Sequence, residues 1–172
     1  MRRLVLLSCW MLLVTLLASG IAWASIDCKA KTTCKGDDKP NVMFGSGGAD
    51  TMRGFGGADS MNGDNGSDKM YGGDGADGGG SKGYMFGGFG NDIMKGGKSH
   101  DYLSGEAGND QLFGNPGVDN LNGDDGKDKI SGGSGNDSID GGYGKDVIDC
   151  GPGRDTVYSP GGDRVKNCEE RI

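Results

Sequence analysis

The chain has 172 residues, of which 38 are glycine and 33% are apolar, and its formal net charge is −7 at pH 7. The low apolar fraction argues against a globular core of large side chains, and a glycine period of nine excludes collagen, whose glycine recurs at every third residue. The sequence contains no basic run, so an acidic chain of this kind is a poor partner for nucleic acid or an anionic membrane and a better one for a cation.

Residues 1–24 have the layout of a secretory signal peptide. Arg2 and Arg3 precede the apolar run 4–17, and residues 22–24 (AWA) offer a small-residue cleavage site. The alternative is an uncleaved membrane anchor, because the apolar stretch is nearly long enough to span a bilayer. We expect cleavage, and therefore a secreted, extracellular protein without a membrane anchor. Loss of the two arginines changes the net charge from −7 to −9.

Cleavage would leave four cysteines: Cys28, Cys34, Cys150 and Cys168. An even number in a secreted chain predicts disulfides, and three pairings are possible. Proximity favours Cys28–Cys34 and Cys150–Cys168, one pair near each end of the chain. Metal ligation by thiolates is the alternative, but no C-x-x-C spacing is present.

Residues 25–44 form an N-terminal segment or cap that contains Cys28 and Cys34. A degenerate repeat begins here at Gly36, with Asn41 and Met43 at positions that carry Asp and an apolar residue further along.

Residues 45–158 consist of a nine-residue repeat, G-x-x-G-x-D-x-(apolar)-x. Such a period means that one small unit is stacked many times. The sixth position holds Asp50, Asp59, Asp68, Asp77, Asp92, Asp101, Asp110, Asp119, Asp128, Asp137, Asp146 and Asp155. The apolar position holds Met52, Met61, Met70, Met94, Leu103, Leu112, Leu121, Ile130, Ile139, Ile148 and Val157.

The repeat loses phase once, at residues 78–86 (GGGSKGYMF). Gly72 and Gly87 are closer together than two full repeats would place them, and Gly83 stands where an Asp is expected, although Met85 keeps the apolar position. Residues 159–172 form a C-terminal cap that drifts out of register.

The repeat predicts an all-β fold without helices. Glycines permit tight turns, and the three residues after each Asp form a short strand whose central side chain points inward. Two turns and two strands, which are two repeats, make one coil, and coils stack about 4.8 Å apart. We expect a right-handed parallel β-roll (β-solenoid) of about six coils. Cys150 and Cys168, which are separated by the length of one coil, would then lie in neighbouring coils.

Turns from every second repeat share one edge of such a roll. Asp92, Asp110, Asp128 and Asp146 would line one edge, and the other would carry Asp101, Asp119, Asp137 and Asp155. Like charges one coil apart repel each other, so a cation is expected between them. Backbone and carboxylate oxygens in sets of about six suit Ca²⁺ better than Mg²⁺, which resists losing its waters.

Residues 87–95 (GGFGNDIMK) and 132–140 (GGSGNDSID) resemble the nonapeptide of the hemolysin-type (RTX) calcium-binding repeat proteins, and the resemblance covers about residues 45–158. It implies that each ion lies between turns two repeats apart. The chain departs from the large members of that family, since it has an N-terminal leader and cysteines. It looks like the short exported members that end in CGPGRD, here residues 150–155.

The resemblance implies one side-chain oxygen from each of the twelve repeat aspartates, from Asp50 to Asp155. It implies up to about eight ions, at the pairs 50/68, 59/77, 92/110, 110/128, 128/146, 101/119, 119/137 and 137/155. Glycine carbonyls would complete the sites, among them those of Gly87, Gly105, Gly123, Gly132, Gly135 and Gly141.

No catalytic constellation is present in the sequence, and His100 has no partner pattern, so we do not expect an enzyme. We expect a secreted protein that folds on binding Ca²⁺. The alternative is a calcium-dependent adhesive or matrix module that contacts a protein or glycan, or that self-associates. Tyr84, Phe86 and Tyr102 at outward strand positions are either ordinary strand formers or a patch for such a partner.

Overall fold

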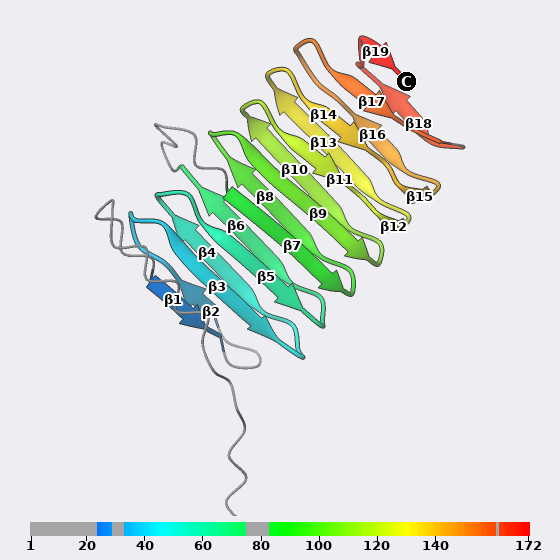
Figure 1. The fold of residues 1–172 in the computed structure, drawn as a ribbon. Helices are drawn as coiled ribbons and strands as arrows, with labels where there is room; N and C mark the ends of the chain where they lie inside the picture. The colour runs from blue at the N-terminus through cyan, green and yellow to red at the C-terminus, as the bar shows by residue number, and fades with distance from the viewer. Residues whose placement is uncertain (1–23, 29–32, 75–82, 161) are drawn as a thin grey trace, which may run out of the picture.

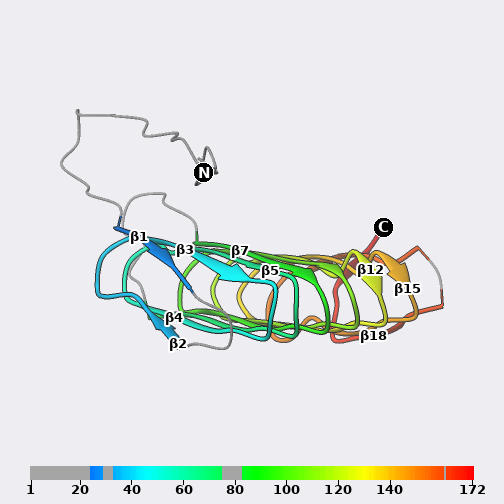
Figure 2. The ribbon, with the colours of Figure 1, turned by 90° about the horizontal axis from the view of Figure 1, so that it is seen from below.

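The computed structural model describes residues 24–28, 33–74, 83–160 and 162–172, so almost all of the expected signal peptide lies outside the described residues. The elements within these ranges are all strands. They form two parallel sheets that face each other as a β-solenoid of about seven turns with a spacing of about 18 residues (Figures 1 and 2). No helix that could cross a membrane occurs in the described ranges.

Successive strands alternate between the two sheets, which we call sheet A and sheet B. The main path of sheet A runs through β1 (Ala24–Asp27), β3 (Asn41–Ser46), β5 (Ser60–Asp64), β7 (Gly83–Phe89), β9 (Asp101–Ala107), β11 (Asn120–Asn122), β14 (Ser138–Asp140), β17 (Thr156–Tyr158) and β19 (Glu170–Arg171), with β12 (Asp125–Gly126) and β15 (Tyr143–Gly144) beside it. Sheet B contains β2 (Thr33–Lys35), β4 (Thr51–Phe55), β6 (Lys69–Gly73), β8 (Ile93–Gly97), β10 (Gln111–Pro116), β13 (Lys129–Ser134), β16 (Val147–Asp149) and β18 (Arg164–Lys166).

The core is one row of apolar side chains per sheet. Because side chains alternate along a strand, only the central residue of each short strand points between the sheets. The register keeps these residues in line, as in Leu103 opposite Leu121 and Leu112 opposite Ile130. Sheet A contributes Met43, Met61, Met85, Leu103, Leu121, Ile139 and Val157, and sheet B contributes Met52, Met70, Met94, Leu112, Ile130 and Ile148, all of them buried.

Both sheets continue without interruption across the expected phase break. Ser60 pairs with Tyr84 and Lys69 pairs with Ile93, so each strand here pairs with one that lies further along the chain than elsewhere. The offset in this coil is 24 residues where the regular coils have 18. Met85 still stacks on Met61 in the core.

The roll has about seven turns and not about six because both terminal segments add strands to it. Strands β1 and β2 extend the two sheets at the N-terminal end, and β18 and β19 extend them at the C-terminal end. The last strands, in which Ile148 pairs with Val165 and Thr156 pairs with Glu170, follow offsets shorter than those of the regular coils.

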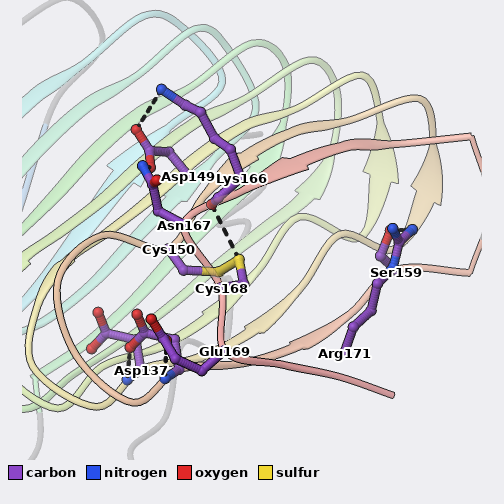
Figure 3. Close-up of a disulfide and its surroundings, with 10 residues drawn as sticks. Asp137, Asp149, Cys150, Ser159, Lys166, Asn167, Cys168, Glu169 and Arg171 are labelled. Atoms are coloured by element: carbon purple, nitrogen blue, oxygen red, sulfur yellow. Dashed lines mark hydrogen bonds and ion pairs between the residues drawn. A yellow bond between two sulfur atoms is a disulfide. The ribbon is translucent and has the colours of Figure 1, made fainter.

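Disulfides link Cys28 to Cys34 and Cys150 to Cys168, with Cα atoms 5.8 Å and 5.2 Å apart. Figure 3 shows the second bond, which joins the final coil to the coil before it. The main-chain N–H of Cys150 also donates to the carbonyl of Lys166. This end of the solenoid is thus held covalently as well as by strand pairing.

Close stacking of the turns depends on glycine. Gly135 has a φ of +137°, and a Cβ at this position would overlap the carbonyl oxygen of Gly117 in the preceding coil. A side chain here would separate the two coils, and most L-residues avoid this backbone conformation in any case.

Candidate metal centre

The repeat aspartates in the described residues are all buried, although each lies at the turn that leads into a strand. They are Asp50, Asp59, Asp68, Asp92, Asp101, Asp110, Asp119, Asp128, Asp137, Asp146 and Asp155. Those before the strands of sheet B line one edge of the roll, and those before the strands of sheet A line the other. Burial of so many carboxylates is costly unless each is paired or bound to a cation.

One oxygen of most of these carboxylates accepts a hydrogen bond from the neighbouring coil, whereas Oδ2 of Asp50 accepts from the N–H and hydroxyl of Ser46 in its own turn. The main-chain N–H of Asp110 donates to Oδ1 of Asp128 at 2.7 Å, and that of Asp119 donates to Oδ1 of Asp137 at 2.9 Å. The same bond, at 2.7 to 2.9 Å, joins the pairs 50/68, 68/92, 92/110, 128/146, 101/119 and 137/155. These eight bonds hold the aspartates in two columns.

The other carboxylate oxygen is buried and accepts no hydrogen bond. This holds for Oδ1 of Asp50 and for Oδ2 of Asp68, Asp92, Asp110, Asp119, Asp128, Asp137, Asp146 and Asp155. A buried acceptor without a donor is destabilising and calls for an explanation such as a bound ion.

The unsatisfied oxygen faces the first glycine of its own turn, next to a backbone carbonyl from the next coil. At Gly87, the position of an ideal Cβ is 2.6 Å from Oδ2 of Asp92 and 2.5 Å from the carbonyl oxygen of Gly105. At Gly123 it is 2.6 Å from Oδ2 of Asp128 and 2.5 Å from the carbonyl oxygen of Gly141. A negative and a neutral oxygen therefore converge where glycine leaves room.

Burial raises the pKa of seven of these aspartates, which are Asp68, Asp92, Asp110, Asp119, Asp128, Asp137 and Asp146. The pKa of Asp110 and of Asp119 rises from 3.8 to about 7, and that of Asp68 and of Asp128 rises to about 6, mainly because burial removes the charged form from water. Neighbouring carboxylates raise the pKa of Asp110 further, while the N–H of Asp92 lowers it in part. Without a cation, the column resists being fully charged near neutral pH.

Five of the six glycines whose carbonyls were expected as ligands lie at such contacts, since the carbonyl oxygen of Gly87 faces Gly63 in the same way, whereas that of Gly135 faces Gly153. Carbonyl oxygens of Gly105, Gly123 and Gly141 lie beside the first glycine of the preceding coil on one edge, and that of Gly132 lies beside Gly114 on the other. The described residues contain no group of three or more His, Cys, Asp or Glu side chains arranged to hold a metal. A cation at these turns would thus take most of its oxygens from the backbone, which suits Ca²⁺.

The register bears on the expected 59/77 pair. The described residue in line with Asp59 is Gly83, because Ser60 pairs with Tyr84. Asp77 itself lies outside the described residues. The structure also brings together Asp68 and Asp92, 24 residues apart, a pair that repeat counting missed.

Acidic residues outside the repeat close both columns at the C-terminal end. The N–H of Asp146 donates to Oδ1 of Asp163, and the N–H of Asp155 donates to Oε2 of Glu169, beside the Cys150–Cys168 bond (Figure 3). At the N-terminal end, Asn41 donates its N–H to Oδ1 of Asp59. Asn41 stands where the degenerate repeat was expected. Asp163 repeats the D-x-(apolar) pattern eight residues after Asp155 and not nine, whereas the repeat gave no signal for Glu169.

Comparison with known families gives one match. The model of the RTX calcium-binding nonapeptide repeat matches the chain in four copies, at residues 35–70, 44–78, 86–121 and 122–157, which together cover more than half of it. No curated protein matches the chain.

Proposed function

Because the chain belongs to the RTX calcium-binding nonapeptide repeat family, we propose that it is a secreted, non-enzymatic calcium-binding protein that folds as Ca²⁺ binds between its stacked turns. The observation that carries this proposal is the buried carboxylate oxygen without a donor, repeated along both edges of the roll. One unsatisfied oxygen could be explained by local strain. Unsatisfied oxygens that recur in every coil indicate a row of cation sites.

The ligands that we propose are the second carboxylate oxygen of the repeat aspartates together with glycine carbonyls. Asp50, Asp59, Asp68, Asp77, Asp92, Asp101, Asp110, Asp119, Asp128, Asp137, Asp146 and Asp155 would supply side-chain oxygens, and Gly87, Gly105, Gly123, Gly132, Gly135 and Gly141 would supply carbonyls. Eight pairs of repeat aspartates are bonded between coils, which supports up to about eight ions.

Coupling of folding to calcium follows from the balance of charge and apolar area. A strand of the array buries at most one large apolar side chain, and the chain must also bury carboxylates that repel one another. Bound Ca²⁺ would remove that repulsion, so the free energy of binding would become free energy of folding. Millimolar extracellular calcium is sufficient for weak sites of this kind.

Two features support an extracellular location. Residues 1–24 have the composition of a signal peptide, and the two disulfides are of the kind that persists in oxidising compartments.

Circular dichroism of residues 25–172 tests the proposal directly. With EGTA we expect the spectrum of a largely unfolded chain, and with millimolar Ca²⁺ we expect a β spectrum that Mg²⁺ at the same concentration does not produce. A β spectrum that is unchanged by chelation would refute calcium-coupled folding while leaving the family assignment intact.

A second candidate function is calcium-dependent adhesion through sheet A. The rings of Tyr84 and Phe86 lie 5.9 Å and 6.1 Å from that of Tyr102, so the three aromatics form one cluster on neighbouring strands. Such a cluster suits stacking against a glycan or a protein. Loss of calcium-dependent binding to a glycan array in the variant Tyr84→Ser/Phe86→Ser/Tyr102→Ser would support it. An array with no ligand for the unaltered chain would argue against it.

A further inference from the structure

The outward face of sheet B carries most of its charge as Lys and Arg. On each strand the residues on either side of the core position point away from the roll. The cations at these positions are Lys35, Arg53, Lys69, Lys95, Lys129, Arg164 and Lys166, and all of them are exposed. They are scattered over more than a hundred residues of sequence, which is why the sequence shows no basic run.

The N-terminal half of this face is a continuous stripe. Lys35, Arg53, Tyr71 and Lys95 lie in register on β2, β4, β6 and β8, and Lys69 lies on the same strand as Tyr71. The Arg53 guanidinium is 4.8 Å from the centre of the Tyr71 ring, and the Lys95 ammonium is 5.9 Å from it. Ring contacts therefore hold the cations side by side in spite of their like charge.

Few acidic side chains lie among these cations to neutralise their charge. Among the outward strand positions of sheet B that the structure describes, Asp149 is the only acidic residue, and it pairs with Lys166 at 2.8 Å. A chain with a net charge of −7 thus presents one strongly positive face.

Sheet A has the opposite character. From β1 to β17 its outward strand positions within the described residues contain no Lys or Arg, and the exposed aromatics Phe44, Tyr84 and Tyr158 lie among them. The terminal strand β19 carries one exposed cation, Arg171. A trough of about 920 Å³ opens on the same face, with Glu106, Asp124 and Asp125 in its lining and no basic side chain. Within the trough, the Ser104 hydroxyl donates a hydrogen bond to the Asp124 carboxylate. The carboxylates of Glu106 and Asp125 are exposed and can meet a partner.

From these two faces we propose that one molecule stacks its sheet B on sheet A of a second copy of this chain. Exposed Lys and Arg would meet carboxylates and the faces of aromatic rings, both of which attract cations. The spacing also matches, because both faces belong to the same coils and repeat at the same strand separation of about 4.8 Å. This inference concerns the faces of the roll and goes beyond the proposed function of its turns.

The geometry of the assembly follows from the use of two different faces. A contact between unlike surfaces leaves sheet A free on one molecule and sheet B free on the other, so that addition continues. We therefore expect rows of stacked rolls and not a closed dimer.

Sedimentation of residues 25–172 in millimolar Ca²⁺ tests the inference. At low salt the average mass should rise with protein concentration. At about 1 M NaCl, where screening acts within about 3 Å, it should fall to that of a single chain. A single chain at every concentration and salt would overturn the proposal. If that chain bound a polyanion such as dextran sulfate through the same cations, sheet B would instead face an anionic partner.

Charge reversal distinguishes a specific contact from a general effect of charge. The sheet B variant Arg53→Glu/Lys69→Glu/Lys95→Glu and the sheet A variant Glu106→Lys/Asp125→Lys/Glu170→Lys should each weaken association by about tenfold or more. A mixture of the two should associate again, because each acidic face then meets a basic one. Association of either variant alone at the strength of the unaltered chain would refute the stacking.

The matched control is Lys127→Glu/Lys145→Glu/Arg154→Glu. It makes the same change in net charge as the sheet B variant, but at exposed turn positions away from both faces. It should associate like the unaltered chain, and an equal loss would show that the contact is not on sheet B. Calcium-loaded circular dichroism of every variant separates loss of association from loss of fold.

Discussion

The main-chain N–H of Asp92 donates to Oδ1 of Asp110, 2.8 Å away and one coil further along the roll. This bond uses one oxygen of the Asp110 carboxylate and leaves Oδ2 buried without a donor. The same side chain thus joins two coils and offers an oxygen to a cation. Substitutions that separate these two tasks provide the sharpest tests of the site.

Asp110→Asn should make the metal-free roll more stable and calcium binding weaker. Asn keeps an oxygen that can accept from the N–H of Asp92, and it removes a buried charge, whose cost the raised pKa of Asp110 reveals. We expect a gain of at least about 1 kcal/mol at pH 8 without metal, and the loss of calcium from the two adjoining sites. The folded fraction without metal, followed by circular dichroism, and calorimetric titration with Ca²⁺ measure the two effects.

Asp125→Asn is the control for that substitution, since Asp125 is an exposed acidic residue outside the columns. It should leave both measurements unchanged. An unchanged number of bound ions in Asp110→Asn would contradict the proposed ligand set.

Without metal, the stability of the roll should rise as the pH falls from 8 to 5. Asp110 and Asp119 have pKa values of about 7 in the folded chain, and Asp68 and Asp128 of about 6, against 3.8 when unfolded. Between those values the folded chain holds more protons than the unfolded chain, so the free energy of unfolding decreases with rising pH. The loss of stability caused by ionising these buried carboxylates is complete above pH 7 and disappears near pH 4.

The folded fraction of the metal-free chain, followed by circular dichroism at pH 5, 6, 7 and 8, measures this dependence. Calcium affinity should change in the opposite direction, because protons compete for the same oxygens below about pH 7. A folded fraction of the metal-free chain that increases with pH would show that the carboxylates are not buried as the structure has them.

Gly87→Ala should reduce both stability and calcium binding. Its Cβ would stand 2.6 Å from Oδ2 of Asp92 and 2.5 Å from the carbonyl oxygen of Gly105, where the proposed ion takes its ligands. Overpacking of this kind costs about 1–3 kcal/mol. The thermal midpoint at several calcium concentrations reports the loss.

Gly47→Ala is the matched control, since nothing lies within 4 Å of a Cβ at Gly47. We expect a change within about 0.5 kcal/mol. Equal effects at the two glycines would mean that the convergence of oxygens at Gly87 is unimportant.

Removal of the Cys150–Cys168 bond should release the final coil. The bond closes a loop of 18 residues, for which chain entropy predicts a cost of about 3 kcal/mol. The double variant Cys150→Ser/Cys168→Ser should show fast hydrogen exchange in residues 162–172, with the earlier coils still protected when calcium is present. Uniformly fast exchange along the chain would instead make this bond essential for the whole roll.

Much of the fold could be predicted because the nine-residue repeat places both the apolar side chains of the core and the aspartates of the two columns. Leu103, Leu121 and Ile139 stack as the spacing of 18 residues requires, and so do Asp110 and Asp128. The period could not predict the register across residues 75–82. Counting from Gly72 to Gly87 suggested a coil shorter than the others, whereas Gly72 faces Gly96 and this coil is the longer one.

The residues that end the two aspartate columns, and the charged face of sheet B, could not be predicted from the sequence for a different reason. Asp163 and Glu169 reach the columns only because the last strands change their offset. Arg53 and Lys95 become neighbours of Tyr71 only through strand pairing between successive coils, one of which is the long one. Both depend on long-range register, which no local pattern contains.

The donor–acceptor chain along each column has a direction, since each of these aspartate N–H groups is satisfied by the coil that follows it. During synthesis from the N-terminus, the newest turn consequently lacks the acceptor for its aspartate N–H. Only arrival of Asp163 and Glu169 completes the last two bonds. The C-terminal segment thus supplies the acceptors that the last aspartate of each column needs.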